Sequence, residues 1–151
     1  MKKFCFPLRS VATVRSLREI RAREQFSATV QAYVAAEEHL QELRARLVEL
    51  EDILRSGRAK TFRAGDEASF LEAFKKETVR ATRAAAETAK ARAAMEAARQ
   101  AWLESRCDVR VIEKLEQKAR GEHRREADRE DQAALDDRTS ALAARNGPDH
   151  S

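Results

Sequence analysis

The chain has 151 residues with a formal net charge of +4, and 37% of its residues are charged while only 5% are aromatic. It contains four glycines and two prolines and is rich in Ala, Glu, Arg, Lys and Leu, which lose little conformational freedom in a helix. This composition excludes a compact globular core, favours a coiled coil or long helix, and therefore predicts an all-α fold.

The first helix is predicted to begin at Pro7, whose missing N–H is tolerated in a first helical turn, and to end at Gly57, which suits a left-handed cap. Its first part carries an apolar stripe that we expect to be buried: Leu8, Val11, Val14, Leu17 and Ile20. From residue 26 onward, two rows recur every seven residues, as in a coiled-coil seam. They are Phe26, Tyr33, Leu40, Leu47 and Leu54, with the companion row Thr29, Ala36, Leu43 and Leu50.

A loop is predicted over Thr61 to Gly65, with Asp66 as the N-cap of a second helix and Glu67 in its first turn. This helix has its own seam, whose middle is rich in alanine. One row is Phe74, Ala81, Thr88, Met95, Trp102 and Val109, and the other is Phe70, Glu77, Ala84, Ala91, Ala98, Ser105, Ile112 and Ala119. The helix is expected to continue to about Ala144, and residues 146–151 are expected to be disordered.

Two long helices joined by a short loop are expected to fold back on each other as an antiparallel coiled-coil hairpin, which is a single domain over residues 1–145. Pairing outward from the turn gives these expected neighbours: Leu54 with Phe70, Tyr33 with Thr88, Phe26 with Met95, and Leu8 with Ile112. The second helix then has no partner beyond about Leu115, and we expect this highly charged C-terminal helical overhang to fray in the isolated protein.

The N-terminal stretch is strongly basic, since residues 1–23 contain seven Lys or Arg and a single acid, Glu19. A basic arm can meet nucleic acid, an anionic membrane surface or an acidic protein face. A DNA-binding basic zipper has the same order of a basic stretch before heptads. The apolar stripe on that stretch argues against it, and the chain's single Asn is Asn146, so we expect no nucleic-acid partner.

No catalytic constellation is found in the sequence. The glycines form no phosphate-binding loop, and the three histidines, His39, His123 and His150, lack ligand spacing with each other or with Cys5 and Cys107. The cysteines are expected to be reduced. We therefore expect no enzyme activity, no cofactor and no metal.

No signal peptide or membrane span is expected. Arg9 and Arg15 interrupt the first apolar stretch too early for a signal peptide, although an Arg-rich transit peptide is an alternative. No run reaches the roughly 20 apolar residues of a membrane helix.

Several segments together resemble the FliJ family of flagellar export proteins, over about residues 4–145. The opening Phe4-Cys5-Phe6-Pro7-Leu8, followed by Val11, Val14-Arg15 and Leu17-Arg18, is similar to the N-terminus of that family. Residues 36–43 look like the end of its first helix. Residues 98–102, Leu115, and the Asp136-Asp137 pair before Ala141 resemble its C-terminal helix.

The resemblance implies a coiled-coil stalk without enzyme activity that links an export ATPase to the export gate and also handles export chaperones. The expected partners are the ATPase hexamer, the cytoplasmic domain of the gate membrane protein, and export chaperones. The chain itself is expected to be a monomer or weak oligomer, located in the cytoplasm and peripherally associated with the inner face of the cell membrane.

The resemblance also implies two sets of partner-binding residues. The set facing the gate is His39, Leu43, Leu47, Leu50, Phe70 and Phe74. The set facing the ATPase ring is Arg9, Arg15, Arg18, Arg124, Arg125, Asp136 and Asp137. For the leucines, packing within the seam is an equally good interpretation. The sequence carries Arg46 where the gate-facing patch of the family tends to be apolar or aromatic.

Two other interpretations stay open at this point. The first is a stalk protein of a virulence type III secretion system, of the YscO group, which shares the same shape. The second is a structural coiled coil of another assembly, which would form a stable homodimer.

Overall fold

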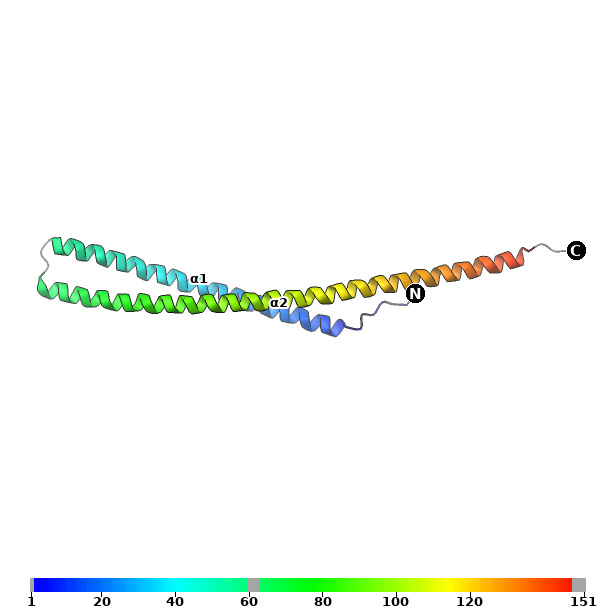
Figure 1. Ribbon diagram of the computed structural model, residues 1–151, viewed down its shortest axis with the longest axis horizontal. Helices are drawn as coiled ribbons and strands as arrows, with labels where there is room; N and C mark the ends of the chain where they lie inside the picture. The colour runs from blue at the N-terminus through cyan, green and yellow to red at the C-terminus, as the bar shows by residue number, and fades with distance from the viewer. Residues whose placement is uncertain (1, 60–62, 148–151) are drawn as a thin grey trace. The chain divides into compact units, whose positions relative to one another are not determined.

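The computed structural model describes residues 2–59 and 63–147 and contains two helices (Figure 1). Helix α1 spans Arg9–Ala59 and helix α2 spans Ala64–Arg145. Within these described ranges there is no β-strand, so the predicted all-α fold is confirmed.

The helix ends differ from the prediction by a few residues. Helix α1 begins at Arg9 rather than at Pro7, which lies in a turn closed by the Arg9 N–H donating to the Phe6 carbonyl (3.2 Å). It continues two residues past Gly57, because one glycine costs a helix only about 1 kcal/mol and Arg58 and Ala59 are good helix formers.

Helix α2 begins at Ala64, so Gly65 and Asp66 are part of it rather than loop and N-cap. The Arg63 carbonyl accepts hydrogen bonds from the N–H groups of Asp66 (3.0 Å) and Glu67 (3.1 Å). Both carboxylates lie in the first turn, where the helix dipole favours acids. The predicted loop residues 61 and 62, and residues 148–151 of the predicted disordered tail, lie outside the described residues.

By their contacts, the residues form two units, one of Met1–Leu17 with Arg106–Ser151 and the other of Arg18–Ser105. In the second unit, contacts between the helices follow an antiparallel order. The Thr88 hydroxyl lies 3.2 Å from the Ala36 carbonyl, and further along α2 the Trp102 indole N–H donates to Glu19 (3.0 Å). Residues with higher numbers on α2 thus contact residues with lower numbers on α1.

The core of the Arg18–Ser105 unit is formed by leucines of α1 on alanines of α2. Leu40, Leu43, Ala81 and Ala84 are buried, and Leu47 packs against them. Alanine at the facing positions lets the two backbones approach closely. All residues of the two predicted seam rows between 26 and 54 are buried or half-buried, as are those of the two rows on α2, so the predicted seam is confirmed.

An aromatic stack closes the far end of this unit. The rings of Phe26 and Trp102 lie nearly parallel, 12° apart in plane, with centroids 5.6 Å apart. Phe26 was expected beside Met95, whereas its ring partner lies one heptad further along α2. The stack places Trp102 so that its indole N–H reaches Glu19 and donates to it, which satisfies the polar end of a ring that is otherwise packed in the seam.

In the other unit, the N-terminal residues pack along α2 well beyond Leu115, where the sequence predicted no partner. Phe6 is 5% exposed and Ile112 is 4% exposed. Glu116 pairs with Arg9 at 3.4 Å. The Phe4 ring lies 5.5 Å from the His123 ring, edge to face. The prediction missed this because a non-helical segment rises about 3.3 Å per residue, roughly twice a helix, so residues before α1 reach further than helical pairing allows.

The apolar stripe at the start of α1 is exposed, which contradicts its predicted burial. The exposed fractions of Leu8, Val11, Val14, Leu17 and Ile20 are 39%, 37%, 48%, 50% and 38%. Residues that recur every three positions shift progressively around a helix, because each turn holds about 3.6 residues. The seam of residues 26–54 instead recurs every seven positions and stays close to one face of the helix. Carried back along α1, that seam falls on other residues, which are all half-buried: Ala12, Arg15, Glu19 and Ala22.

Among the described residues, no helix combines the length and apolar character needed to cross a bilayer.

Replacing Leu43 with Ala is expected to destabilise the fold by about 2–3 kcal/mol, because the side chain is 4% exposed and its loss leaves a cavity in the seam. Urea unfolding followed by circular dichroism measures this. Val48→Ala is the matched control, since Val48 is 56% exposed and its loss should change stability by less than about 0.5 kcal/mol. Equal effects of the two substitutions would contradict the observed seam.

Replacing Glu19 with Ala is expected to cost about 1–2 kcal/mol, since it removes a charged acceptor from the half-buried Trp102 indole. Tryptophan fluorescence should also change, because Trp102 is the only tryptophan. Glu24→Ala, on the exposed side of α1, serves as control and should leave the emission spectrum unaltered. An emission spectrum that does not respond to loss of Glu19 would show that this contact is absent in solution.

Candidate protein-interaction site

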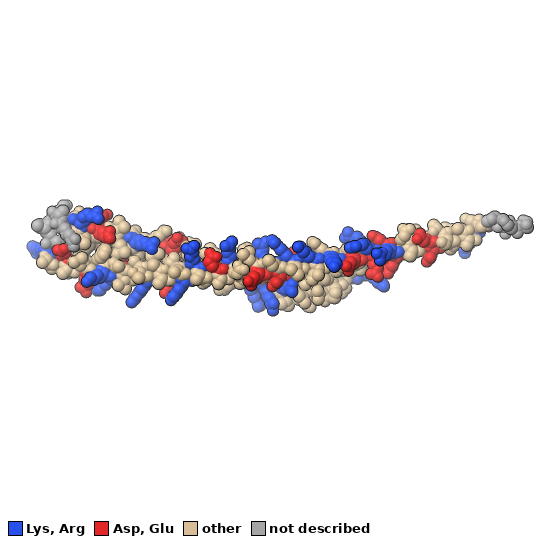
Figure 2. All heavy atoms as spheres, viewed as in Figure 1, with Lys and Arg blue, Asp and Glu red and all other residues tan. Residues whose placement is uncertain are grey.

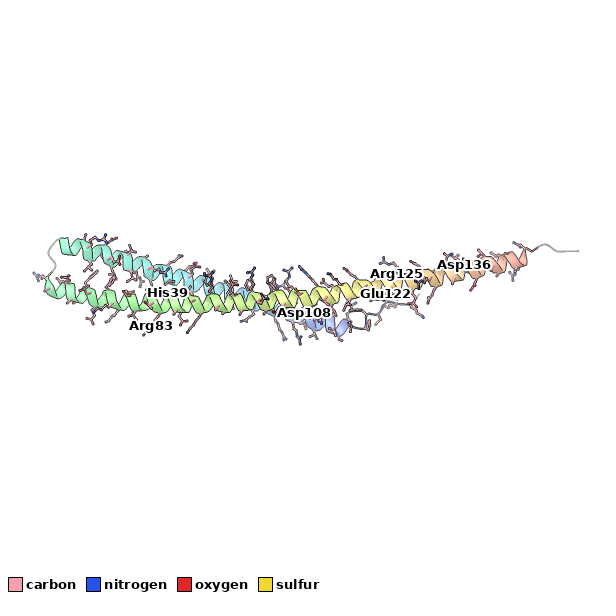
Figure 3. The ribbon with its side chains drawn as sticks, viewed as in Figure 1. His39, Arg83, Asp108, Glu122, Arg125 and Asp136 are labelled. Carbon is pink, nitrogen blue, oxygen red and sulfur yellow. The ribbon has the colours of Figure 1, made fainter. Side chains whose placement is uncertain are left out.

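A shallow groove crosses the seam in the Arg18–Ser105 unit and has a volume of ≈ 460 Å³. Its apolar residues are Ala36, Leu43 and Ala84, and its polar residues are His39, Arg46, Arg80, Arg83 and Glu87. Figure 3 labels His39 on α1 and Arg83 on α2, which both line this groove.

The groove exists because small residues on α2 leave space beside the leucines of α1. Ala84 is buried, and the neighbouring Thr88 keeps its hydroxyl turned inward, 2.8 Å from the Ala84 carbonyl. The long charged side chains lie at the edges of the groove, where their charged ends reach water.

The charge at the groove is mainly positive. Three arginines line it against a single carboxylate, Glu87, which also pairs with Lys90 at 3.8 Å. Arg80 pairs with Glu77 at 3.2 Å, while His39, Arg46 and Arg83 are exposed. An apolar floor with a cationic rim is suited to a peptide or protein segment that carries both apolar and acidic side chains.

Of the six residues predicted to face the gate, the structure brings two into this groove, His39 and Leu43. Leu43 is buried in the seam, so only its edge is available to a partner. The other four are half-buried seam residues that do not line the groove: Leu47, Leu50, Phe70 and Phe74.

Sequence reasoning missed the contribution of α2 to this groove, which comes from Arg80, Arg83, Ala84 and Glu87. These residues form no motif of their own, and only the register of α2 against α1 brings them beside His39. The register between the helices was predictable from the seam rows. Charged residues next to the rows of α1 and α2 could then have been compared at the same height along the helix pair, which would have found these residues.

The residues predicted to face the ATPase ring are distributed over both units. In the unit that contains the N-terminus, Arg9 pairs with Glu116, and Arg15 donates to the Asp108 carbonyl at 3.0 Å. Arg18 is exposed and belongs to the other unit. Arg15 is half-buried, so packing on α2 already accounts for much of its side chain.

The C-terminal members of this set are exposed on the last turns of α2. Figure 3 labels Arg125 and Asp136 there. Arg125 donates to the Gly121 carbonyl at 3.4 Å, and Asp136 accepts from Gln132 at 3.1 Å. Arg124 and Asp137 are exposed as well, which leaves these four side chains accessible to a partner.

No group of His, Cys, Asp or Glu side chains in the described part of the chain is arranged to hold a metal ion. Cys5 and Cys107 are free and exposed.

These features define a protein of the all-α, coiled-coil-like interaction class. A comparison with models of protein families matches residues 3–148 to FliJ, the flagellar FliJ protein family. The chain belongs to the FliJ family, which takes part in flagellar protein export and is a non-catalytic structural and chaperone family. No curated protein and no solved structure matches the chain.

Proposed function

We propose that this protein is a coiled-coil stalk of the flagellar export apparatus that links the export ATPase ring to the cytoplasmic domain of the export gate. Its two helices form an antiparallel hairpin with a C-terminal helical overhang. It acts in the cytoplasm, at the inner face of the cell membrane, and also binds export chaperones. It has no catalytic activity alone and stimulates ATP hydrolysis by its partner.

The observation that carries the proposal is the family match over residues 3–148, which favours the flagellar system over the virulence stalk proteins. The cationic groove supports the gate-facing role, with His39, Arg46 and Arg83 exposed around the edge of Leu43. The exposed charged end of α2 supports contact with the ATPase ring, through Arg124, Arg125, Asp136 and Asp137.

The test is a binding assay of the full chain with the purified export ATPase and with the cytoplasmic domain of the gate protein from the same bacterium. We expect the chain to bind both and to raise the ATPase rate. Binding to neither partner would overturn the proposal. A stable homodimer that binds neither the ATPase nor the gate domain would favour a structural coiled coil of another assembly.

Replacing His39 with Ala and Arg83 with Glu together is expected to weaken binding to the gate domain by about tenfold or more, because it removes the imidazole of His39 and reverses the charge of Arg83 at the rim. Binding to the ATPase should stay unchanged. The control is Arg21→Glu, an exposed arginine that does not line the groove. If the control lowers gate binding as much as the double substitution, the groove is not the docking site.

A further inference from the structure

The unit of residues 1–17 and 106–151 exposes several large aliphatic side chains. Eight large apolar side chains of this unit are at least 37% exposed: Leu8, Val11, Val14, Leu17, Val111, Leu115, Leu135 and Leu142. They fall into two groups. Six lie where the N-terminal segment packs on α2, and two lie on the last turns of α2.

Four residues of the first group lie on one side of the helix pair and form what is called here the apolar patch: Val11, Val14, Val111 and Leu115. Val11 directly precedes the half-buried Ala12, and Leu115 directly precedes the half-buried Glu116. In two antiparallel helices, the positions directly before such seam residues lie on the same side of the pair. Val14 and Val111 are the helical neighbours of these two residues, three or four positions away. Figure 2 shows uncharged surface over the N-terminal end of α1.

The second group lies on residues 128–145, called here the C-terminal arm, in which every residue is exposed. Leu135 and Leu142 are 55% and 57% exposed and lie seven residues apart, on one face of the helix. Asp131 and Asp128 lie on the same face, one and two turns before Leu135, respectively. One face of the arm therefore carries two exposed leucines followed, toward the start of the arm, by two acidic side chains.

The charges of the patch and the arm are opposite. Residues 2–17 and 106–118, which carry the apolar patch, contain eight basic and three acidic side chains. The arm contains three basic and five acidic side chains. Complementary charge around complementary apolar surfaces is what a specific interface requires. Both halves of such an interface are thus present on this one chain.

We propose that the C-terminal arm of one copy packs on the apolar patch of a second copy, and the reverse, in a two-fold symmetric head-to-head dimer. The arm is the third helix beside the N-terminal segment and α2. A two-fold axis makes the two contacts identical, so each copy buries both of its exposed groups at once. This inference does not rest on the proposed export role. Because the arm includes Asp136 and Asp137, the dimer must separate before these residues contact an ATPase ring.

The spacing of the residues fixes the direction of packing. When Leu135 of the second copy lies between Val111 and Leu115, antiparallel packing places its Leu142 beside Cys107 and its Asp131 beside Lys114 and Lys118. Parallel packing would instead place Leu142 near Arg120 and Gly121, where no aliphatic side chain is present. Antiparallel packing therefore matches both the apolar and the charged residues.

Sedimentation of the full chain over a range of micromolar concentrations tests the proposal. We expect a species of twice the 17.1 kDa of a single chain. Leu135→Asp should weaken association by about tenfold or more, because it places a charge in the apolar contact. Leu135 is exposed, so helicity should persist. The matched control, Val48→Asp, replaces an exposed valine of the other unit and should leave the dimer intact.

A charge exchange and a cross-link test the register. Lys118→Asp and Asp131→Lys should each weaken the dimer, and the two together should restore it. In a Cys5→Ser background, Leu142→Cys should form a disulfide with Cys107 of the second copy under oxidation. A single-chain mass for the unaltered protein at all concentrations would overturn the proposal, and so would a dimer linked only through Cys107 to Cys107.

Binding to anionic vesicles tests whether a membrane surface, rather than a second copy of the chain, covers the apolar patch. The dimer predicts that the unaltered chain does not sediment with phosphatidylglycerol vesicles. A chain that stays monomeric and sediments with these vesicles, but not with neutral phosphatidylcholine vesicles, would assign the apolar patch to a membrane surface and overturn the dimer.

Discussion

The structure depends on one thin seam, in which leucines of α1 pack on alanines of α2. Among the described residues of the Arg18–Ser105 unit, Leu40, Leu43, Ala81 and Ala84 are buried, and no charged or polar residue is buried in the described part of the chain. A helix pair without a globular core has little stability to spare, so the regular period of seven along this seam decides how the helices face each other. The same contact forms the groove, because alanine leaves room where a larger residue would fill the seam.

The N-terminal part of α1 shows how strongly the seam constrains its neighbours. Its apolar residues were expected to be buried by their own spacing, yet the longer seam determines the rotation of the helix and turns Arg15 and Glu19 toward α2. Each of these polar residues is accommodated by a specific partner, the Asp108 carbonyl for Arg15 and the Trp102 indole for Glu19. Two of the displaced residues, Val11 and Val14, then belong to the exposed apolar patch that the proposed dimer uses.

The two helices, the seam between residues 26 and 54 and the family were all predictable from the sequence, because each depends on a pattern repeated over many residues. The helix ends at Ala59 and Ala64 were not, since a single glycine or aspartate changes the free energy of extending a helix by only about 1 kcal/mol. The packing of Phe4 near His123 depends on a non-helical segment that has no periodic signal. For the candidate site, His39 and Leu43 were found from family resemblance, whereas Arg80 and Arg83 required the register between the helices.

A distance measurement between His39 and Arg83 tests most directly whether α1 and α2 of one chain pack side by side. With a spin label at each position, in a chain without its native cysteines, the account predicts a separation below about 25 Å, since packed helices lie about 8–10 Å apart. The distance should persist when labelled protein is diluted with unlabelled protein. A separation on the order of 65 Å, as expected for 44 residues of one continuous helix, or a short distance that disappears on dilution, would contradict the account.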